Sequence, residues 1–196
     1  SIYKVDFSDL EAITETPYID LQQNSWVPDP FTLSGETLYY TVYDNNSNQR
    51  TQFKKVGDAD PEILGTFNDG VKIVETNDKL FFIGSYFYLE YEGEQLTNND
   101  RLYFNMNNFN LNYSKLEVYN NEIYTVNTEA NNKPGKLSIS GTQVSFSPLP
   151  VTETASINYL DIDSTTGNLI LQVSEYTNSN YSYSVNSYQL APQLKI

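Results

Sequence analysis

Short apolar runs bounded by polar turns recur along this chain at nearly even intervals. Four times a polar pair is followed by an aliphatic residue and a β-forming stretch, at 36–40, 78–82, 121–125 and 167–171. The aliphatic anchors of these runs lie 42, 43 and 46 residues apart, and they are Leu38, Leu80, Ile123 and Leu169. A period in this range is typical of one supersecondary unit repeated along the chain, with each copy burying its apolar face against the next.

The order of signals around each anchor predicts four strands per repeat. An alternating stretch such as 71–74 comes first, and the anchor strand follows after a polar turn. A polar loop then precedes a third strand, such as Thr51–Val56, and a short fourth run, such as Val144–Phe146. Repeats of ~40–50 residues with four antiparallel strands are typical of propeller blades. We therefore expect an all-β fold, with no helix longer than two turns between Phe31 and Gln189 and with the anchors on inner strands.

The two ends of the chain depart from whole repeats. At the N-terminus, Ile2–Phe7 followed by Leu10–Thr14 looks like the third and fourth strands of a unit whose first two strands are missing. At the other end, Ser182–Tyr188 and Gln193–Ile196 complete the fourth unit. Because an open edge leaves backbone groups unpaired, we expect another chain, another segment or the C-terminus to complete the half blade. The prediction is one domain over 1–196, a β-propeller-like array of about four and a half blades, with a half blade at 1–20 and blades at about 24–67, 68–108, 109–150 and 151–196.

Composition excludes several kinds of chemistry. The chain has no Cys and no His, which removes thiolate nucleophiles, Ser-His-Asp triads and ordinary zinc sites. Its 25 acidic residues against 11 basic ones give a net charge of −14, a field that repels phosphate backbones and anionic headgroups. No window reaches the ~18 apolar residues of a membrane span. We therefore expect neither nucleic acid nor membrane insertion among the partners.

The most motif-like segment runs from Asp161 to Asn168. It partly resembles a calcium loop with Asp at alternate positions, but Thr166 stands where an EF-hand needs Gly and Gln172 where it needs Glu. The simplest interpretation is a turn capped by Asp and Thr side chains. We expect no cofactor and no transition metal; if a metal binds, we expect Ca²⁺ at Asp161 and Asp163.

Aromatic residues offer the clearest candidate binding surface. Two strands, 86–91 and 181–188, alternate tyrosines with other residues, so half of these rings are expected to point outward. Tyr combines a flat face with a hydroxyl, which suits stacking on sugars or peptides. The predicted ligand-binding residues are Tyr86, Tyr88, Tyr91, Tyr181 and Tyr183.

Carboxylate pairs are the alternative source of chemistry. Asp58 with Asp60, and Glu90 with Glu92, each place two acids at i and i+2, which is one face of a strand. A hydrolase or lyase would need such a pair in one pocket together with Tyr. Pairs of this kind are frequent in so acidic a chain, so exposed surface charge is the simpler explanation.

The repeat, its turn phrases and the third-strand phrase Lys4-Val5-Asp6-Phe7-Ser8 resemble bacterial β-propellers of the broad WD40, NHL and Kelch-like sort. The likeness is architectural, since neither a Gly-His…Trp-Asp pair nor a Kelch double glycine is present. It implies a ring of blades whose central mouth and loop faces carry binding, and it transfers no catalytic residue.

Together these observations favour a binding or scaffold module that is not an enzyme. The expected partner is a peptide, a glycan or a protein, and the expected location is extracellular, at the cell surface or periplasmic. Two alternatives stay open: a carbohydrate-active hydrolase or lyase that uses a carboxylate pair with Tyr, and a structural segment of a larger surface adhesion protein.

Overall fold

The computed structural model describes residues 2–6, 14–19, 21, 25–27, 31–76, 79–104, 106, 109–129, 132–151, 156–177 and 180–190. The fold is all-β, with 64% strand. Its only helical elements within these residues are two single turns of 3-10 helix, Asn98–Asp100 (η1) and Tyr113–Lys115 (η2). The expected absence of longer helices is confirmed for the described residues.

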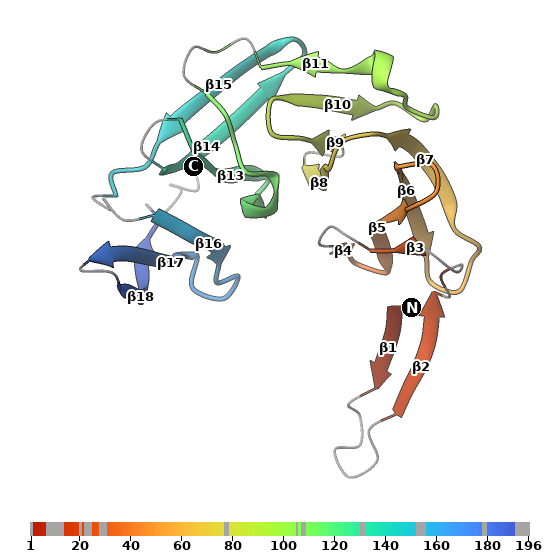
Figure 1. The fold of residues 1–196 in the computed structure, drawn as a ribbon, viewed down its shortest axis with the longest axis horizontal. Helices are drawn as coiled ribbons and strands as arrows, with labels where there is room; N and C mark the ends of the chain where they lie inside the picture. The colour runs from red at the N-terminus through yellow and green to blue at the C-terminus, as the bar shows by residue number, and fades with distance from the viewer. Residues whose placement is uncertain are drawn as a thin grey trace, which may run out of the picture.

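Four antiparallel sheets follow one another along the chain (Figure 1). In the last three, consecutive strands are neighbours, as in a meander. The first sheet holds β3 (Ser25–Trp26), β4 (Thr32–Ser34), β5 (Thr37–Asp44), β6 (Gln49–Val56) and β7 (Glu62–Phe67), with β3 and β4 both paired to β5. The second sheet holds β8 (Lys72–Thr76), β9 (Lys79–Ile83), β10 (Phe87–Tyr91) and β11 (Leu102–Tyr103). The third holds β12 (Glu117–Tyr119), β13 (Glu122–Asn127), β14 (Lys133–Ser140) and β15 (Gln143–Pro148), and the fourth holds β16 (Ser156–Ile162), β17 (Asn168–Thr177) and β18 (Asn180–Gln189).

The anchor strands of the first three sheets, β5, β9 and β13, are buried on both faces. In β9, all four residues from Leu80 to Ile83 are buried. Leu80 and Phe82 pack with Tyr39 of the first sheet, whereas Phe81 and Ile83 pack with Ile123 of the third. Successive side chains of a strand point to opposite faces, so one strand contributes to two cores. This is why the anchor runs are continuously apolar rather than alternating.

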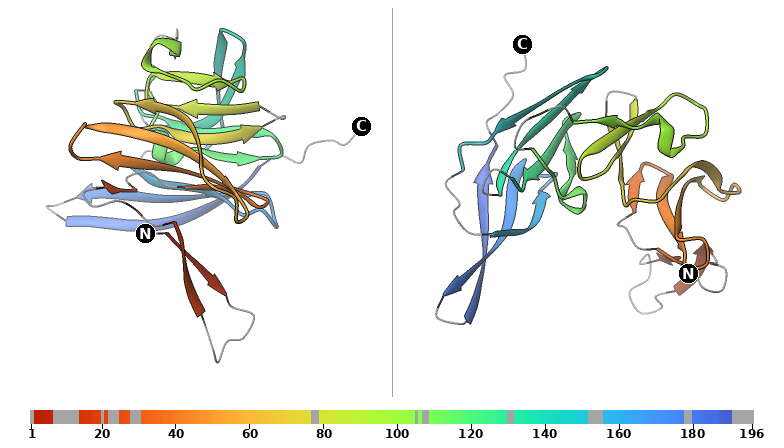
Figure 2. Two further views of the ribbon diagram at one scale, coloured as in Figure 1. Left: turned by 90° about the vertical axis from the view of Figure 1, so that its right-hand side faces the viewer. Right: turned by 45° about the horizontal axis from the view of Figure 1, so that its top comes forward.

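The same rule holds along the array. The anchor and the residue two positions further on face the preceding sheet, and the residue between them faces the following one. In the fourth sheet, Leu169 and Leu171 pack with Tyr124 and Val126 of the third sheet. Figure 2 shows the sheets stacked on one another in this way. Each interface therefore joins the following side of one sheet to the preceding side of the next.

The anchors are buried, and each lies on the second strand of its repeat, as the sequence predicts. They lie at the start of the strands β5, β9, β13 and β17, which are paired on both sides, whereas the first strands lie at the edges of the sheets. The first strands β4, β8, β12 and β16 contact one another in sequence. The prediction that the anchors lie on inner, buried strands, each after a first strand, is confirmed.

A separate hairpin precedes the four sheets. Its strands β1 (Ile2–Asp6) and β2 (Thr14–Ile19) pair with each other and, among the described residues, with no other strand. Tyr18, Ile19 and Leu21 pack on Leu38 and Tyr40 of the first sheet. The predicted second strand at 10–14 instead begins at Thr14, and residues 7–13 lie outside the described part, as do residues 193–196 of the predicted closing strand.

Candidate functional site

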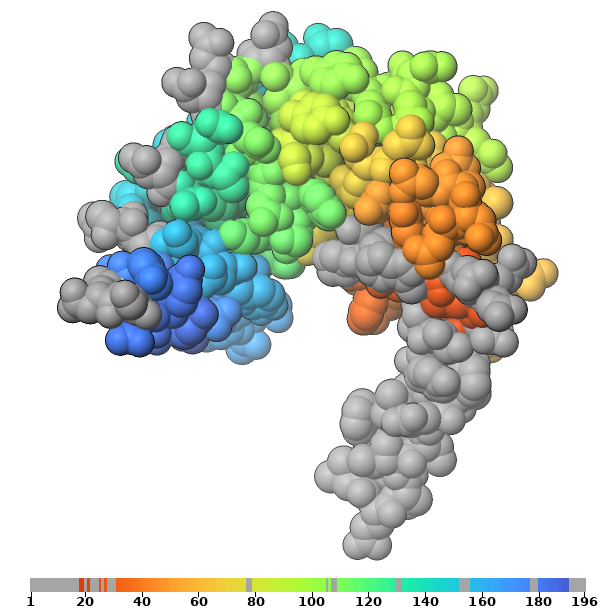
Figure 3. All heavy atoms as spheres, in the orientation of Figure 1, coloured from red at the N-terminus to blue at the C-terminus, as the bar shows by residue number. Residues whose placement is uncertain are grey.

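A groove of about 460 Å³ runs along the concave side of the array, where the first strands of all four sheets meet. Figure 1 shows β4, β8 and β16 on this concave side, and Figure 3 shows an open notch between the first and last sheets. Thr32 and Leu33 come from β4, Val74 from β8, Val118 from β12 and Tyr159 from β16. The groove thus joins residues that are more than a hundred positions apart in sequence.

Side chains hydrogen-bonded to the backbone of the next sheet hold these strands in place. The Thr32 hydroxyl donates to the Ile73 carbonyl at 2.7 Å, which ties the first sheet to the second. The Lys72 ammonium donates to the carbonyl of Leu116, the residue just before β12 of the third sheet. The Lys115 ammonium donates to the Ile157 carbonyl in the fourth sheet. Burial lowers the pKa of Lys115.

Large apolar side chains are exposed along the groove. Leu33 is 66% exposed, Phe31 57% and Tyr159 50%, and Val118 lies beside them. A single exposed apolar side chain is ordinary, but several in one concave site mark a place where apolar partner groups bind.

Charge in the groove is mainly negative. Glu117 forms an ion pair with the nearly buried Lys72 at 2.8 Å, and Glu75 adds a second carboxylate to the lining. Burial, together with the nearby Asp161 and Glu117 carboxylates, raises the pKa of Tyr159. The groove therefore combines apolar contact surface with a negative potential that favours cations.

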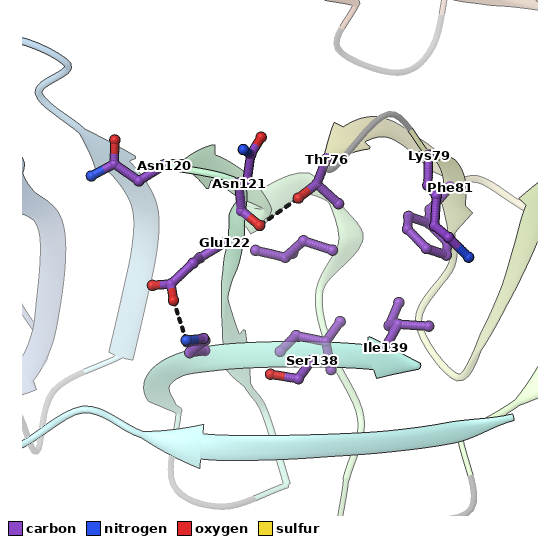
Figure 4. Close-up of a pocket in the computed structure, with 11 residues that line it drawn as sticks. Thr76, Lys79, Phe81, Asn120, Asn121, Glu122, Ser138 and Ile139 are labelled. Carbon is purple, nitrogen blue, oxygen red and sulfur yellow. Dashed lines mark hydrogen bonds and ion pairs between the residues drawn. The ribbon is translucent and has the colours of Figure 1, made fainter. Parts of the chain in front are cut away.

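A smaller cleft of about 370 Å³ lies between the second and third sheets (Figure 4). Its polar groups are engaged with one another: the Thr76 hydroxyl donates to the Asn121 carbonyl, and the Lys136 ammonium pairs with Glu122, which also accepts the Tyr124 hydroxyl. The Asn120–Asn121 turn above it has positive φ at both residues, as a two-residue hairpin turn requires. These contacts join two sheets and leave little polar capacity for a ligand.

The five predicted ligand-binding tyrosines do not form one site. Tyr86 is exposed on the second sheet and stacks on Tyr103, with ring centroids 6.0 Å apart. Tyr181 and Tyr183 are both 65% exposed on the fourth sheet, where they stack on each other. The structure places the two groups on different sheets.

The expectation of a stacking face is wrong for Tyr88, which is only 1% exposed. Its ring packs on Phe104 and its hydroxyl donates to the Gly141 carbonyl at 2.6 Å, so it belongs to the core between the second and third sheets. Tyr91 is half-buried against the core and donates to Glu62.

The Asp161–Asn168 segment forms the turn between β16 and β17. The Asp163 carboxylate accepts hydrogen bonds from the Thr165 and Thr166 backbone and from the Thr166 hydroxyl, and these bonds lower its pKa. The described residues contain no group of three His, Cys, Asp or Glu side chains arranged to hold a metal. The Ca²⁺ site at Asp161 and Asp163 stays a prediction.

The carboxylates of the alternative enzyme hypothesis lie on the surface. Glu90 pairs with Lys79 on the neighbouring strand, and Asp58, Asp60 and Glu92 are exposed. Within the described residues, no helix is long and apolar enough to cross a membrane.

Comparison of the sequence with protein-family models finds no match, and neither does comparison with curated proteins. Function is therefore argued from the groove itself. The sequence predicts the first strands but not this groove, because the exposure of Leu33 and Tyr159 depends on how the four sheets stack. The one signal in the sequence was the apolar residue in each first strand, such as Leu33 or Val118, which need not be buried.

Proposed function

We propose that the chain is a partial β-propeller whose four sheets are blades, and that it works as a binding module. Its ligand is an extended peptide segment with apolar side chains and at least one Lys or Arg, held in the groove along the first strands. The observation that carries this proposal is the gathering of Phe31, Leu33 and Tyr159 in one concave site.

Strand edges in the groove favour a peptide over a glycan. Among the described strands, β4, β8, β12 and β16 each pair on one side only, so their other edges face the groove. Backbone groups at such edges can hydrogen-bond an extended chain, while side-chain pockets select its residues.

Charge favours a cationic ligand. Lys72 is already paired with Glu117, so the Glu75 carboxylate dominates the remaining charge of the lining. The net charge of −14 adds a long-range field that attracts basic peptides and speeds their association.

The module is proposed to be non-catalytic. Imidazole and thiol are missing from its chemistry, and the described acidic pairs lie on exposed surface or in ion pairs. The predicted extracellular, cell-surface or periplasmic location stays a prediction.

Selection from a display library of linear 12-residue peptides tests the proposal. Enriched peptides should combine apolar residues with Lys or Arg. The variant Leu33→Lys removes apolar surface and adds a repelling charge, and it should weaken binding of an enriched peptide at least about tenfold, as measured by calorimetry.

Ile63→Lys is the matched control, because Ile63 is an exposed aliphatic residue on β7 outside the groove. This variant should bind as the unmodified chain does. Failure to enrich any peptide, or equal affinity in both variants and the unmodified chain, would contradict the proposal.

A further inference from the structure

Among the described residues, nothing covers one side of the fourth sheet, whereas the same side of the other three sheets is covered by the following sheet. In β17, Leu169 and Leu171 face the third sheet, so Ile170 and Gln172 face away from it. The register of β18 places Val185 opposite Gln172, and Tyr181 and Tyr183 follow on the same side. We call Ile170, Gln172, Tyr181, Tyr183 and Val185 the terminal face.

The terminal face is mostly apolar, and its residues on β18 are exposed. Val185 is 69% exposed, and the two tyrosines are nearly as exposed. In the first three sheets, the same side of the second strand packs on the following sheet, through Tyr39, through Phe81 and Ile83, and through Tyr124 and Val126. The terminal face thus continues an interface that the chain forms three times.

Strand β18 also has an unusual edge. Its ten residues, Asn180–Gln189, contain neither a charged residue nor proline in a chain that is 18% charged. Proteins normally protect edge strands with charges, proline, shortness or a covering segment. The outer strands of the other sheets are protected in these ways. Strand β11 is only two residues long, β15 ends in Pro148, and Leu96 covers the edge of β7 through backbone hydrogen bonds.

The first sheet carries the complementary surface. Leu38, Tyr40, Val42 and Phe53 lie on its preceding side, which we call the leading face. Only Tyr18, Ile19 and Leu21 cover this face among the described residues, and a groove of about 510 Å³ remains beside them. The two faces lie at opposite ends of the array and do not meet within one chain (Figure 1).

We propose that the terminal face of one copy packs on the leading face of a second copy, with β18 beside the β1–β2 hairpin of that copy. The partner is a second copy because each sheet packs its following side on the preceding side of the next sheet. Among the described residues, the leading face is the one preceding side that no sheet of the array covers. If the two copies are related by a half-turn, two such head-to-tail contacts close a ring of eight sheets. A two-stranded hairpin is marginal alone and gains neighbours in this ring.

Light scattering coupled to size-exclusion chromatography of the whole chain tests the proposal. At about 100 μM the unmodified chain should show twice its sequence mass. Tyr183→Lys and Val185→Lys should each shift the chain to monomer, or raise the dimer dissociation constant at least tenfold. Circular dichroism should be unchanged, because both side chains already lie in solvent in the single chain.

Tyr103→Lys is the matched control, because Tyr103 is a comparably exposed tyrosine on β11, away from both faces. It should leave the dimer intact. A monomeric unmodified chain, a mass that grows beyond the dimer with concentration, or a dimer that Tyr183→Lys and Val185→Lys do not weaken would overturn the proposal.

Discussion

Buried tyrosine hydroxyls are a residue-scale feature of the stacked sheets. Tyr40 is 2% exposed and stacks on Phe53 with ring centroids 5.2 Å apart. Burial raises the pKa of Tyr40 to about 12, and burial with the Glu75 carboxylate raises that of Tyr39 to about 12. Both phenols are therefore held in the neutral form, which makes the folded state less stable at high pH.

The sign of this linkage follows from the raised values. An unfolded tyrosine ionises near pH 10, so the stabilisation is complete below about pH 10 and is lost as the pH rises toward 12. Tyr40→Phe should remove about 2 kcal/mol of this alkaline loss at pH 11.5, because most of the two-unit difference in pKa has been lost by that pH. Urea unfolding at pH 8 and pH 11.5 measures it. Tyr103→Phe, at an exposed site, should keep the full alkaline loss, and an equal effect of both variants would contradict the assignment.

At the scale of elements, β14 shows how packing overrides a local turn signal. The sequence Asn132-Lys133-Pro134-Gly135 is typical of a loop, yet β14 already begins at Lys133. Gly135 pairs with Thr125 on one side and Pro148 on the other. A side chain at this position would overlap the Phe146 ring and approach the Ser147 carbonyl to 2.7 Å. Glycine is needed there for space.

Gly135→Ala therefore tests this element directly. Alanine gains about 0.5–1 kcal/mol over glycine in backbone entropy, but overpacking against a backbone carbonyl costs roughly 1–3 kcal/mol. The clash should prevail, and the free energy of unfolding should fall. Ser138→Ala, at an exposed position of the same strand, should change it by less than about 0.5 kcal/mol. Unchanged or increased stability of Gly135→Ala would contradict this, because it would show that Phe146 and the Ser147 carbonyl can move aside without loss of stability.

Strand existence could be predicted from sequence because local chemistry decides it. The anchor runs at Leu38 and Leu80, followed by turn residues, are sufficient to place β5 and β9. The burial of Tyr88 beside exposed Tyr86 could not be predicted, because both faces of such strands are covered to different extents by neighbouring sheets. The groove depends on Leu33 and Tyr159, which only the stacking of four sheets brings together.

At the scale of the whole molecule, each sheet contacts mainly the sheets before and after it. Three internal cores join the four sheets in sequence, and a fourth joins the first sheet to the hairpin segment. Such an array leaves one side, the row of first strands, free for binding. We propose that the ligand binds along this row and not on an outer tyrosine surface.

Mapping backbone amide chemical shifts of the labelled chain during titration with an enriched basic, apolar peptide tests that claim most directly. Saturable shifts are predicted at Thr32–Ser34, Glu117–Tyr119 and Tyr159, with Ile63 unaffected, and the affinity should fall as salt rises because the field of a −14 chain is screened. Shifts that instead cluster at Tyr86 and Tyr103, or at Tyr181 and Tyr183, would contradict it.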